Sequence, residues 1–383
     1  MRESTVAGRF SKLLAVALCT LLLGVCTSAS AQSLTFATFE APGAGTASDQ
    51  GTFAASINNS GVGTGYYVDS YGNPHGYLRA RDGTITTIDI PGPEGALDEC
   101  GTTPSSINSG GAITGADCFG GGFLRPPDGT FTLFNQSFPS GINDSGAITG
   151  NFPDTGYLVR GFLRAPDGTV TTFDEPDAGN LTGSCCGTNP TAINTSGTIA
   201  GFYIDGNGAQ HGFLRAPDGT FTSFDPPGAS TEFSQGTWAY SINQSGAITG
   251  WYYDANSVIH GFLRAPDGTF TAFDAPGASS ANGLLGTRPY SINTSGAITG
   301  FYQDANGVVH GFRRAANGTF TTLDAPGAGH GTFAFSINQA GAIAGNYWDS
   351  STVSHGFVAT DPQSPLHGPP HGRHHGRGHR DRD

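Results

Sequence analysis

One phrase recurs along the chain, and this repetition restricts the possible folds more than any single residue does. Ser291 to Gly300 is one copy of its first half, and His260 to Asp274 is one copy of its second half. A repeat of about fifty residues, built from short apolar runs and glycine turns, is typical of β-propeller blades. An Ile-Asn step marks the copies at Asn58, Asn108, Asn143, Asn194, Asn243, Asn293 and Asn338.

Each copy contains four short runs with strand character, and the last two are joined by a turn sequence such as Asp218-Gly219. A two-residue turn there would set Phe213 opposite Phe224. Phe213 and Leu214 point to opposite faces, so each sheet is apolar on both faces and needs cover on both. Blades stacked around an axis provide that cover.

The two ends of the repeat region complement each other. The fourth run appears first alone at Leu34 to Glu40, and the third run appears last alone at His355 to Val358. Pairing these ends would remove two open sheet edges. We therefore predict an all-β fold, a seven-bladed β-propeller of four-stranded antiparallel blades over residues 32–360. Its ring would be closed by the N-terminal strand joining the last blade.

Residues 1–31 have the pattern of a signal peptide. Arg2, Arg9 and Lys12 precede an apolar stretch, and Ala29-Ser30-Ala31 matches a cleavage site. No other apolar run is long enough for a transmembrane segment. We expect a secreted or extracytoplasmic protein, in the periplasm or outside the cell. Residues 361–383, rich in His, Arg and Gly, are expected to form a disordered tail.

The charge of the chain disfavours one class of partner. The formal net charge is −13, and Lys12 is its only lysine. Nucleic-acid binding needs clustered Lys and Arg, so we predict no nucleic-acid partner. The expected partner is an extracellular glycan or protein, and the chain is expected to be a monomer.

Cysteines and histidines supply two further predictions. The cysteines beyond residue 31 are disulfide candidates in an exported protein, with their pairing left open. They are Cys100, Cys118, Cys185 and Cys186. Closely spaced tail imidazoles could bind divalent transition metals weakly, and no other cofactor is predicted. These are His371, His374, His375 and His379.

The repeated phrases resemble the HAF family of extracellular repeat proteins, over almost all of residues 34 to 358. The resemblance rests on Ser-Ile-Asn-x-Ser-Gly and on His-Gly-Phe-Leu-Arg occurring together in order. Gly121 and Arg160 depart from it at the His position. The resemblance implies an exported repeat protein and brings no activity or catalytic residue. The His positions that match are His75, His211, His260, His310 and His355.

Polar residues repeated in most copies are interpreted as structural, because active sites are seldom copied in every blade. His211 follows Asp205 by six residues, a pattern open to a metal or proton site or to a turn that caps a strand. Arg215 and its equivalents are expected to contact the next blade or a carbonyl. Asn-x-Ser/Thr sequences suit turns better than glycosylation here, and they begin at Asn58, Asn143, Asn194, Asn243, Asn293 and Asn317.

The second copy differs from the others in its loops. Gly115 to Phe123 and Phe134 to Ile142 are both shorter than the equivalent connections. Two adjacent short loops predict a notch on the face with variable loops, where binding usually occurs. Carboxylates of the flanking loops would make it an acidic ligand-binding groove; simple loop loss is the alternative. The groove candidates are Asp98, Glu99, Asp117, Asp174, Glu175 and Asp177.

These features favour a binding or scaffold module whose ligand is unidentified, an envelope glycan or a protein. A secreted carbohydrate-active enzyme, hydrolase or lyase, is one alternative: Pro-Asp-Gly-Thr-Phe stands where sialidase propellers carry an Asp box, with different spacing. A structural envelope protein without a ligand is the other. No catalytic residue is predicted, because Gly-x-Ser-x-Gly and His-Glu-x-x-His are missing.

Overall fold

The computed structural model describes residues 34–91, 101–117, 120–134, 137–154, 156, 158–179, 187–281 and 286–362. These residues form strands and turns without a helix. Within them, nothing meets the length and apolarity that a membrane-crossing helix requires. The predicted signal peptide and nearly all of the predicted tail, including its four candidate metal-binding histidines, lie outside the described residues. So do Asp98, Glu99, Cys100, Cys118, Cys185 and Cys186.

Antiparallel pairing arranges the strands in groups of four, and we name each group after its first strand. The β2 group contains β2 (Gly51–Ile57), β3 (Gly63–Val68), β4 (Pro74–Arg79) and β5 (Ile85–Thr87). The β6 group contains β6 (Thr102–Ile107), β7 (Ile113–Asp117), β8 (Gly122–Arg125) and β9 (Thr132–Phe134). The β10 group contains β10 (Phe138–Ile142), β11 (Ile148–Pro153), β12 (Val159–Arg164) and β13 (Val170–Phe173). The β14 group contains β14 (Gly187–Ile193), β15 (Ile199–Ile204), β16 (Gln210–Arg215) and β17 (Phe221–Phe224).

The remaining groups follow the same order. The β18 group contains β18 (Thr237–Ile242), β19 (Ile248–Tyr253), β20 (Ile259–Arg264) and β21 (Phe270–Phe273). The β22 group contains β22 (Thr287–Ile292), β23 (Ile298–Gln303), β24 (Val309–Arg314) and β25 (Phe320–Leu323). The β26 group contains β26 (Gly331–Ile337), β27 (Ile343–Trp348) and β28 (Ser354–Thr360).

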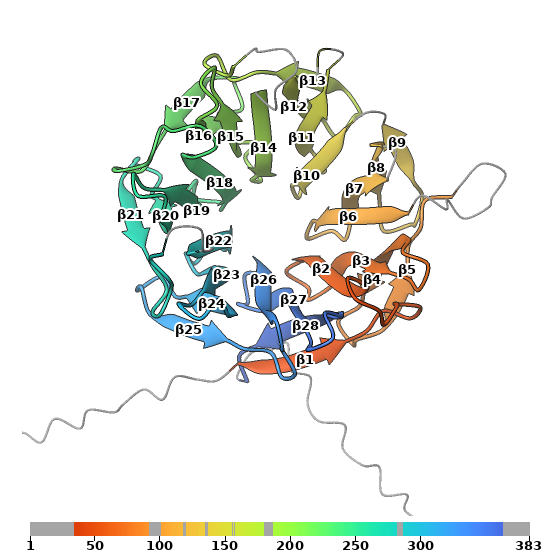
Figure 1. Ribbon diagram of the computed structural model, residues 1–383. Helices are drawn as coiled ribbons and strands as arrows, with labels where there is room; N and C mark the ends of the chain where they lie inside the picture. Colours follow the sequence, from red (N-terminus) through yellow and green to blue (C-terminus); the bar gives the residue numbers. More distant parts are fainter. Residues whose placement is uncertain are drawn as a thin grey trace, which may run out of the picture. The chain divides into compact units, whose positions relative to one another are not determined.

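The fourth strand of the β26 group comes from the other end of the described chain. β1 (Thr35–Phe39) pairs antiparallel with β28, from Thr35 opposite Thr360 to Phe39 opposite Gly356 (Figure 1). A parallel pair between Gly51 and Ser354 also joins β2 to β28. Gly51 has a φ of 109°, and a Cβ there would lie 2.0 Å from the Ser354 carbonyl oxygen, so this contact requires glycine.

The core lies between successive groups. In one cluster, Phe173 of the β10 group packs with Ile193 and Phe213 of the β14 group. In another, Ile57 of β2 packs with Val358 of β28. The sheets are therefore covered on both faces, as predicted. The largest fully buried side chains include one aromatic from the third strand of every group: Tyr77, Phe123, Phe162, Phe213, Phe262, Phe312 and Phe357.

The predicted register of the third and fourth strands is wrong by one residue. Phe213 lies opposite Ser223, and Gly212 lies opposite Phe224. The cause is a three-residue loop, Pro217 to Gly219, in which the Ala216 N–H donates to the Thr220 carbonyl at 2.8 Å. Gly219 has a φ of 93°, as expected for a type I turn followed by a bulge glycine.

Asparagine side chains at the ends of the first strands connect one group to the next. The Asn58 Nδ2 donates to the Asn108 carbonyl at 3.1 Å, and the same contact recurs between successive groups. The last of them, Asn338, donates to the carbonyl of Asn58 at 2.9 Å. The intervening donors are Asn108, Asn143, Asn194, Asn243 and Asn293.

Candidate functional site

The first strand of each group lies nearest the centre in Figure 1, and these strands surround a pocket of about 1080 Å³. Each first strand shifts register two residues before its last isoleucine, as between Ala54 and Ser56. A β-bulge of this kind redirects a side chain. The residues at this bulge position all line the pocket: Ala55, Ser105, Ser140, Thr191, Tyr240, Tyr290 and Phe335.

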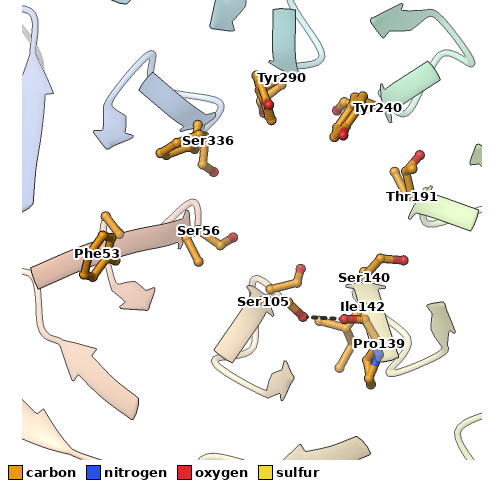
Figure 2. Close-up of a pocket in the computed structure, with 18 of the residues that line it drawn as sticks. Phe53, Ser56, Ser105, Pro139, Ser140, Ile142, Thr191, Tyr240, Tyr290 and Ser336 are labelled. Carbon is orange, nitrogen blue, oxygen red and sulfur yellow. Dashed lines mark hydrogen bonds between the residues drawn. The ribbon is translucent and has the colours of Figure 1, made fainter. Parts of the chain in front are cut away.

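The bulge positions divide the pocket into two walls. We call Tyr240, Tyr290 and Phe335 the aromatic wall. Ser105, Ser140 and Thr191 form the hydroxyl wall. Figure 2 shows the two tyrosines on one side, with Ser105 and Ser140 across the pocket from them. The isoleucine that ends each strand is constant, whereas the bulge position differs from group to group. The position two residues before the bulge also varies, as at Phe53, Phe138 and Trp238.

The aromatic wall is backed by further rings. Tyr240 stacks on Trp251 with 4.2 Å between ring centroids, and lies 4.9 Å from Tyr290. Tyr290 also stacks on Phe301 at 5.2 Å and meets Phe335 edge-on at 5.3 Å. Burial raises the pKa of both tyrosines, which keeps their phenols neutral at physiological pH. The wall is thus a pre-ordered surface of neutral rings. The Arg288 guanidinium lies 5.2 Å from the Trp251 ring centroid and interacts with both tyrosines.

Hydroxyls of the hydroxyl wall also bind the neighbouring group. Ser105 donates to the Pro139 carbonyl at 2.8 Å, and Ser140 donates to the Pro190 carbonyl at 2.7 Å. Thr191 makes the same contact with Ala239. Because these hydroxyl protons are used, the oxygens remain as hydrogen-bond acceptors for a ligand.

Serines beside the aromatic wall have the opposite hydrogen-bonding role: their hydroxyl oxygens accept from the protein. The Ser241 Oγ accepts from the Ile292 N–H at 3.3 Å. Ser291 and Ser336 accept in the same way from the next group. Their hydroxyl protons are therefore able to donate to a ligand. Across the described residues that line the pocket there is no Asp, Glu, Lys, Arg or His.

The shortened loops of the β6 group lie beside this pocket. Asp117 and Gly121 close the turn between β7 and β8, with the Asp117 N–H donating to the Gly121 carbonyl. Phe138 begins the next group, lines the pocket and remains 46% exposed. A Cβ on Gly120 would lie 3.3 Å from the Phe138 ring. The described end of this turn therefore lies near a residue that lines the pocket.

Of the described carboxylates of the predicted acidic groove, those of Asp117, Asp174 and Glu175 have partners within the chain. The Asp117 Oδ1 accepts from the Gly121 N–H at 2.6 Å. Asp174 forms an ion pair with Arg160. Glu175 is buried and accepts from the Ser223 hydroxyl, and from the Asp177 N–H at 2.7 Å. Asp177 is exposed. These contacts hold the loop in place, so we locate the candidate site in the central pocket.

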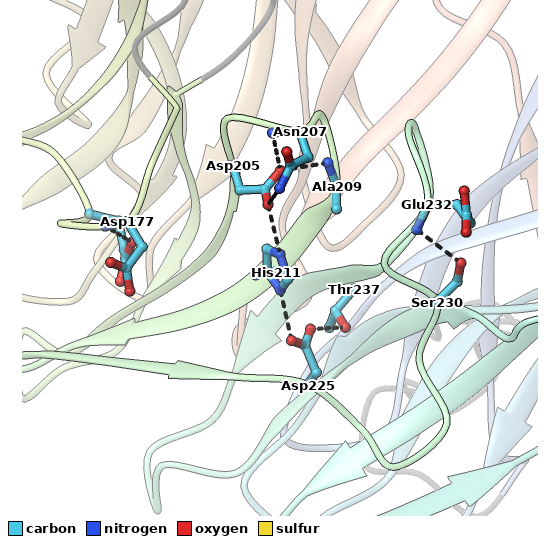
Figure 3. A network of polar contacts seen from close by, with 10 residues as sticks. Asp177, Asp205, Asn207, Ala209, His211, Asp225, Ser230, Glu232 and Thr237 are labelled. Atoms are coloured by element: carbon cyan, nitrogen blue, oxygen red, sulfur yellow. Dashed lines mark hydrogen bonds and ion pairs between the residues drawn. The ribbon is translucent and has the colours of Figure 1, made fainter.

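The repeated histidines bridge two acidic residues. His211 Nδ1 lies 2.7 Å from Asp225, and Nε2 lies 3.8 Å from Asp205 (Figure 3). Asp205 also accepts backbone N–H groups of its own turn, which agrees with the structural interpretation. Arg160 makes the equivalent bridge in the β10 group. Among the described residues, no three His, Cys, Asp or Glu side chains are arranged to hold a metal ion.

The repeated arginines contact aromatic rings, and Arg164 also donates to the Ala165 carbonyl at 3.5 Å. The Arg215 guanidinium lies 4.7 Å from the Phe173 ring centroid in the preceding group, and Arg264 lies 4.9 Å from Phe224. Such cation–π contacts strengthen the packing between sheets. These residues are therefore part of the scaffold.

The sequence-based prediction of a site in charged loops did not include the residues of the central pocket. The signal was present inside the repeat, two residues before each isoleucine. The following Ile-Asn step is constant, whereas this position changes from Ala55 through Ser140 to Tyr240. The direction of the side chain at this position depends on a β-bulge, and the alternation of side chains in a regular strand does not predict a bulge.

Comparisons with solved structures support the fold. The chain is similar to a streptogramin B lyase, with 15% identity, a TM-score of 0.52, and coverage of 85% of this chain and 98% of that chain. It is similar to virginiamycin B lyase from Staphylococcus aureus, with 14% identity, a TM-score of 0.54, and coverage of 85% and 99%. The Dos1 propeller is a more distant likeness, with 10% identity, a TM-score of 0.48, and coverage of 82% and 94%. No protein-family model and no curated protein matches the chain. At these identities the likeness concerns the fold alone.

Proposed function

We propose that residues 34–360 form a seven-bladed β-propeller, closed into a ring by the pairing of β1 with β28. Three observations support this proposal. β1 supplies the fourth strand of the β26 group. The series of asparagine hydrogen bonds returns from Asn338 to Asn58. The cluster around Ile57 and Val358 packs the first group against the last.

We infer that this propeller is a binding module and that the central pocket is its binding site. The observation that carries the inference is the pair of walls that the bulge positions form around one pocket. The pocket offers aromatic rings, hydroxyls and amides, which are groups that hold an uncharged ligand. We further propose an exported monomer, on the strength of the signal pattern in residues 1–31. Membership of the HAF family likewise stays a proposal that rests on the repeated phrases.

Tryptophan fluorescence tests this function directly. The chain has three tryptophans: Trp348 lines the pocket, Trp251 stacks on Tyr240, and Trp238 lies 6.3 Å from Trp251. A library of neutral and charged glycans and small aromatic compounds is titrated against the protein. At least one neutral compound is expected to shift the emission. A library in which no compound does so would favour the ligand-free structural role.

A blocking substitution assigns the signal to the pocket. Ser140→Tyr introduces a side chain that already occupies the bulge position at Tyr240, so the strand accommodates it. It should fill the pocket from the hydroxyl wall and weaken binding by at least about tenfold. The control is Ser351→Tyr, at an exposed turn where the β2 group carries Tyr71. Equal binding by both variants would remove the pocket from the proposal.

A further inference from the structure

The occupant of the pocket is constrained first by charge. The described residues that line the pocket carry no formal charge at neutral pH, and burial keeps Tyr240 and Tyr290 protonated. An ammonium group placed there would lose hydration without gaining an opposite charge. A carboxylate would have only the Arg288 guanidinium nearby, which packs on Trp251 and is not among the residues that line the pocket. The pocket therefore selects neutral molecules.

A second constraint is the arrangement of polar and apolar groups. Tyr240 and Tyr290 offer ring faces and edges, held by Trp251 and Phe301 behind them. Because these rings are already packed, stacking a ligand on them costs little side-chain entropy. The ligand therefore needs at least one flat apolar face.

The hydroxyls define the other side of the ligand. Ser105, Ser140 and Thr191 remain as acceptors, whereas Ser241 and Ser291 remain as donors. A ligand that satisfies both sets must carry groups that donate and accept. Sugar hydroxyls do both, and a pyranose ring also presents a face of C–H groups suited to stacking.

The size of the pocket and the shape of its far end further restrict the class of ligand. At about 1080 Å³ the pocket is at the upper end of the range for small-ligand sites, so it has room for more than one sugar unit. Beyond it lies a smaller polar pocket of about 150 Å³, and Ile142 and Ile193 line both. The polar pocket is bordered by Asn58 and Asn108, whose side chains bind the next group. Because this polar pocket is much smaller than the central one, we expect a chain terminus to enter from the other end.

We propose that the central pocket binds the end of a neutral oligosaccharide, with a sugar ring stacked on Tyr240 and Tyr290. Other sugar hydroxyls donate to the oxygens of Ser105, Ser140 and Thr191. This inference rests on the proposed binding function and names its ligand class.

The test uses isothermal titration calorimetry on the exported form of the chain. The probes are maltotriose, cellotriose and triacetylchitotriose as neutral trisaccharides, trigalacturonic acid as the charged one, and 2-naphthol as a neutral aromatic. At least one neutral trisaccharide is expected to bind, and trigalacturonic acid at least about tenfold more weakly, a difference of ~1.4 kcal/mol.

Variants of the aromatic wall separate stacking from folding. Tyr240→Ala should weaken the trisaccharide about tenfold, whereas Tyr240→Phe keeps the ring and should stay within about threefold of the parent. The control is Tyr71→Ala, which removes a tyrosine that is 89% exposed and outside the pocket. Ser140→Ala should cost about fivefold in affinity, and it removes no ring from the aromatic wall.

The outcomes distinguish the two proposals. Binding of 2-naphthol without any neutral trisaccharide would overturn the sugar assignment and leave the binding function standing. Equal or tighter binding of trigalacturonic acid would also overturn it. If no probe binds, or if binding is indifferent to both Tyr240→Ala and Ser140→Ala, the sugar assignment fails. The broader library with the Ser140→Tyr variant then decides the binding function.

Discussion

Single side chains with two partners hold this repeat together. The Asn243 Oδ1 accepts from the Ser245 and Ala247 N–H groups and so closes its own turn. Its Nδ2 donates to the Asn293 carbonyl in the next group at 3.1 Å. Asn243 is only 5% exposed, so both ends of the amide are used within the protein. The Asn-x-Ser/Thr sequence at this site therefore belongs to a turn.

Replacing Asn243 by Asp tests the inter-group contact. The carboxylate keeps the oxygen that closes the turn but lacks the Nδ2 donor. The Asn293 carbonyl then keeps only its bond from the Gly296 N–H and faces a buried carboxylate oxygen. The free energy of unfolding should fall by roughly 1–3 kcal/mol, measured by urea denaturation. Asn317→Asp is the matched control, since Asn317 is exposed and Asp218 stands at the same turn position in the β14 group. A comparable loss in both variants would contradict this account.

At the residue scale, sequence reasoning recognised the turn role of the asparagines but not their reach into the next group. The repeat showed which residues recur, and recurrence marked them as structural. It did not show where Nδ2 points, because that depends on how closely neighbouring sheets approach. For the same reason, the sequence did not predict that Tyr240 and Ser140 line a common pocket.

The hairpins between the third and fourth strands show why the register of strands is harder to predict than their order. The sequence contains Asp-Gly, which serves both two-residue turns and three-residue turns with a bulge. The structure adopts the second, and the register moves by one residue. His211 and Asp225 thereby lie on the same face, near enough for a 2.7 Å contact. The strand order was predictable because the apolar runs recur; the register was not.

The histidine bridges predict a dependence of stability on pH. Hydrogen bonds to Asp225 and Asp274 raise the pKa of His211 and His260 above the ordinary value near 6.5. Their stabilising effect is therefore complete below about pH 6.5 and is lost as the pH rises through the raised pKa. The free energy of unfolding should be greater at pH 6 than at pH 8, measured by urea denaturation.

Substitutions assign this pH dependence to the bridges. Asp205 and Asp254 have a lowered pKa, the result of hydrogen bonds from their turns outweighing burial, so they stay charged from pH 6 to pH 8. The double change of His211 and His260 to Gln should reduce the difference between the two pH values. His330→Gln, at an exposed histidine outside the bridges, should leave it unchanged. An unaltered profile in the double variant would assign the effect elsewhere.

On the scale of the whole molecule, the first and last strands depend on each other. Phe36 packs on Phe357 with 5.3 Å between ring centroids, and Glu40 pairs with His355. The partner of the Leu34 to Glu40 segment could be predicted from the sequence, because the last copy of the repeat lacks a fourth run and this segment is a fourth run without a third. The pocket between the groups could not, since it depends on seven separate strands being brought around one centre.

Deleting residues 34–40 tests this dependence. Loss of the segment would uncover Phe357 and leave the edge of β28 unpaired, which also favours aggregation. The free energy of unfolding should fall by roughly 3 kcal/mol or more, as for the loss of a buried aromatic. A synthetic peptide of residues 33–41 should restore part of the stability. Deletion of residues 366–383 is the control, and an equal effect of both deletions would contradict the prediction.

The asparagine contacts that pass from group to group and back to Asn58 have an evolutionary consequence. Solenoid proteins lengthen or shorten by whole modules, because only their caps sense the change. In the closed ring that we propose no module is terminal, so gaining or losing one would disrupt the series of contacts. Duplication of a single module should therefore be selected against, and diversity should accumulate by point substitution at positions such as Tyr240.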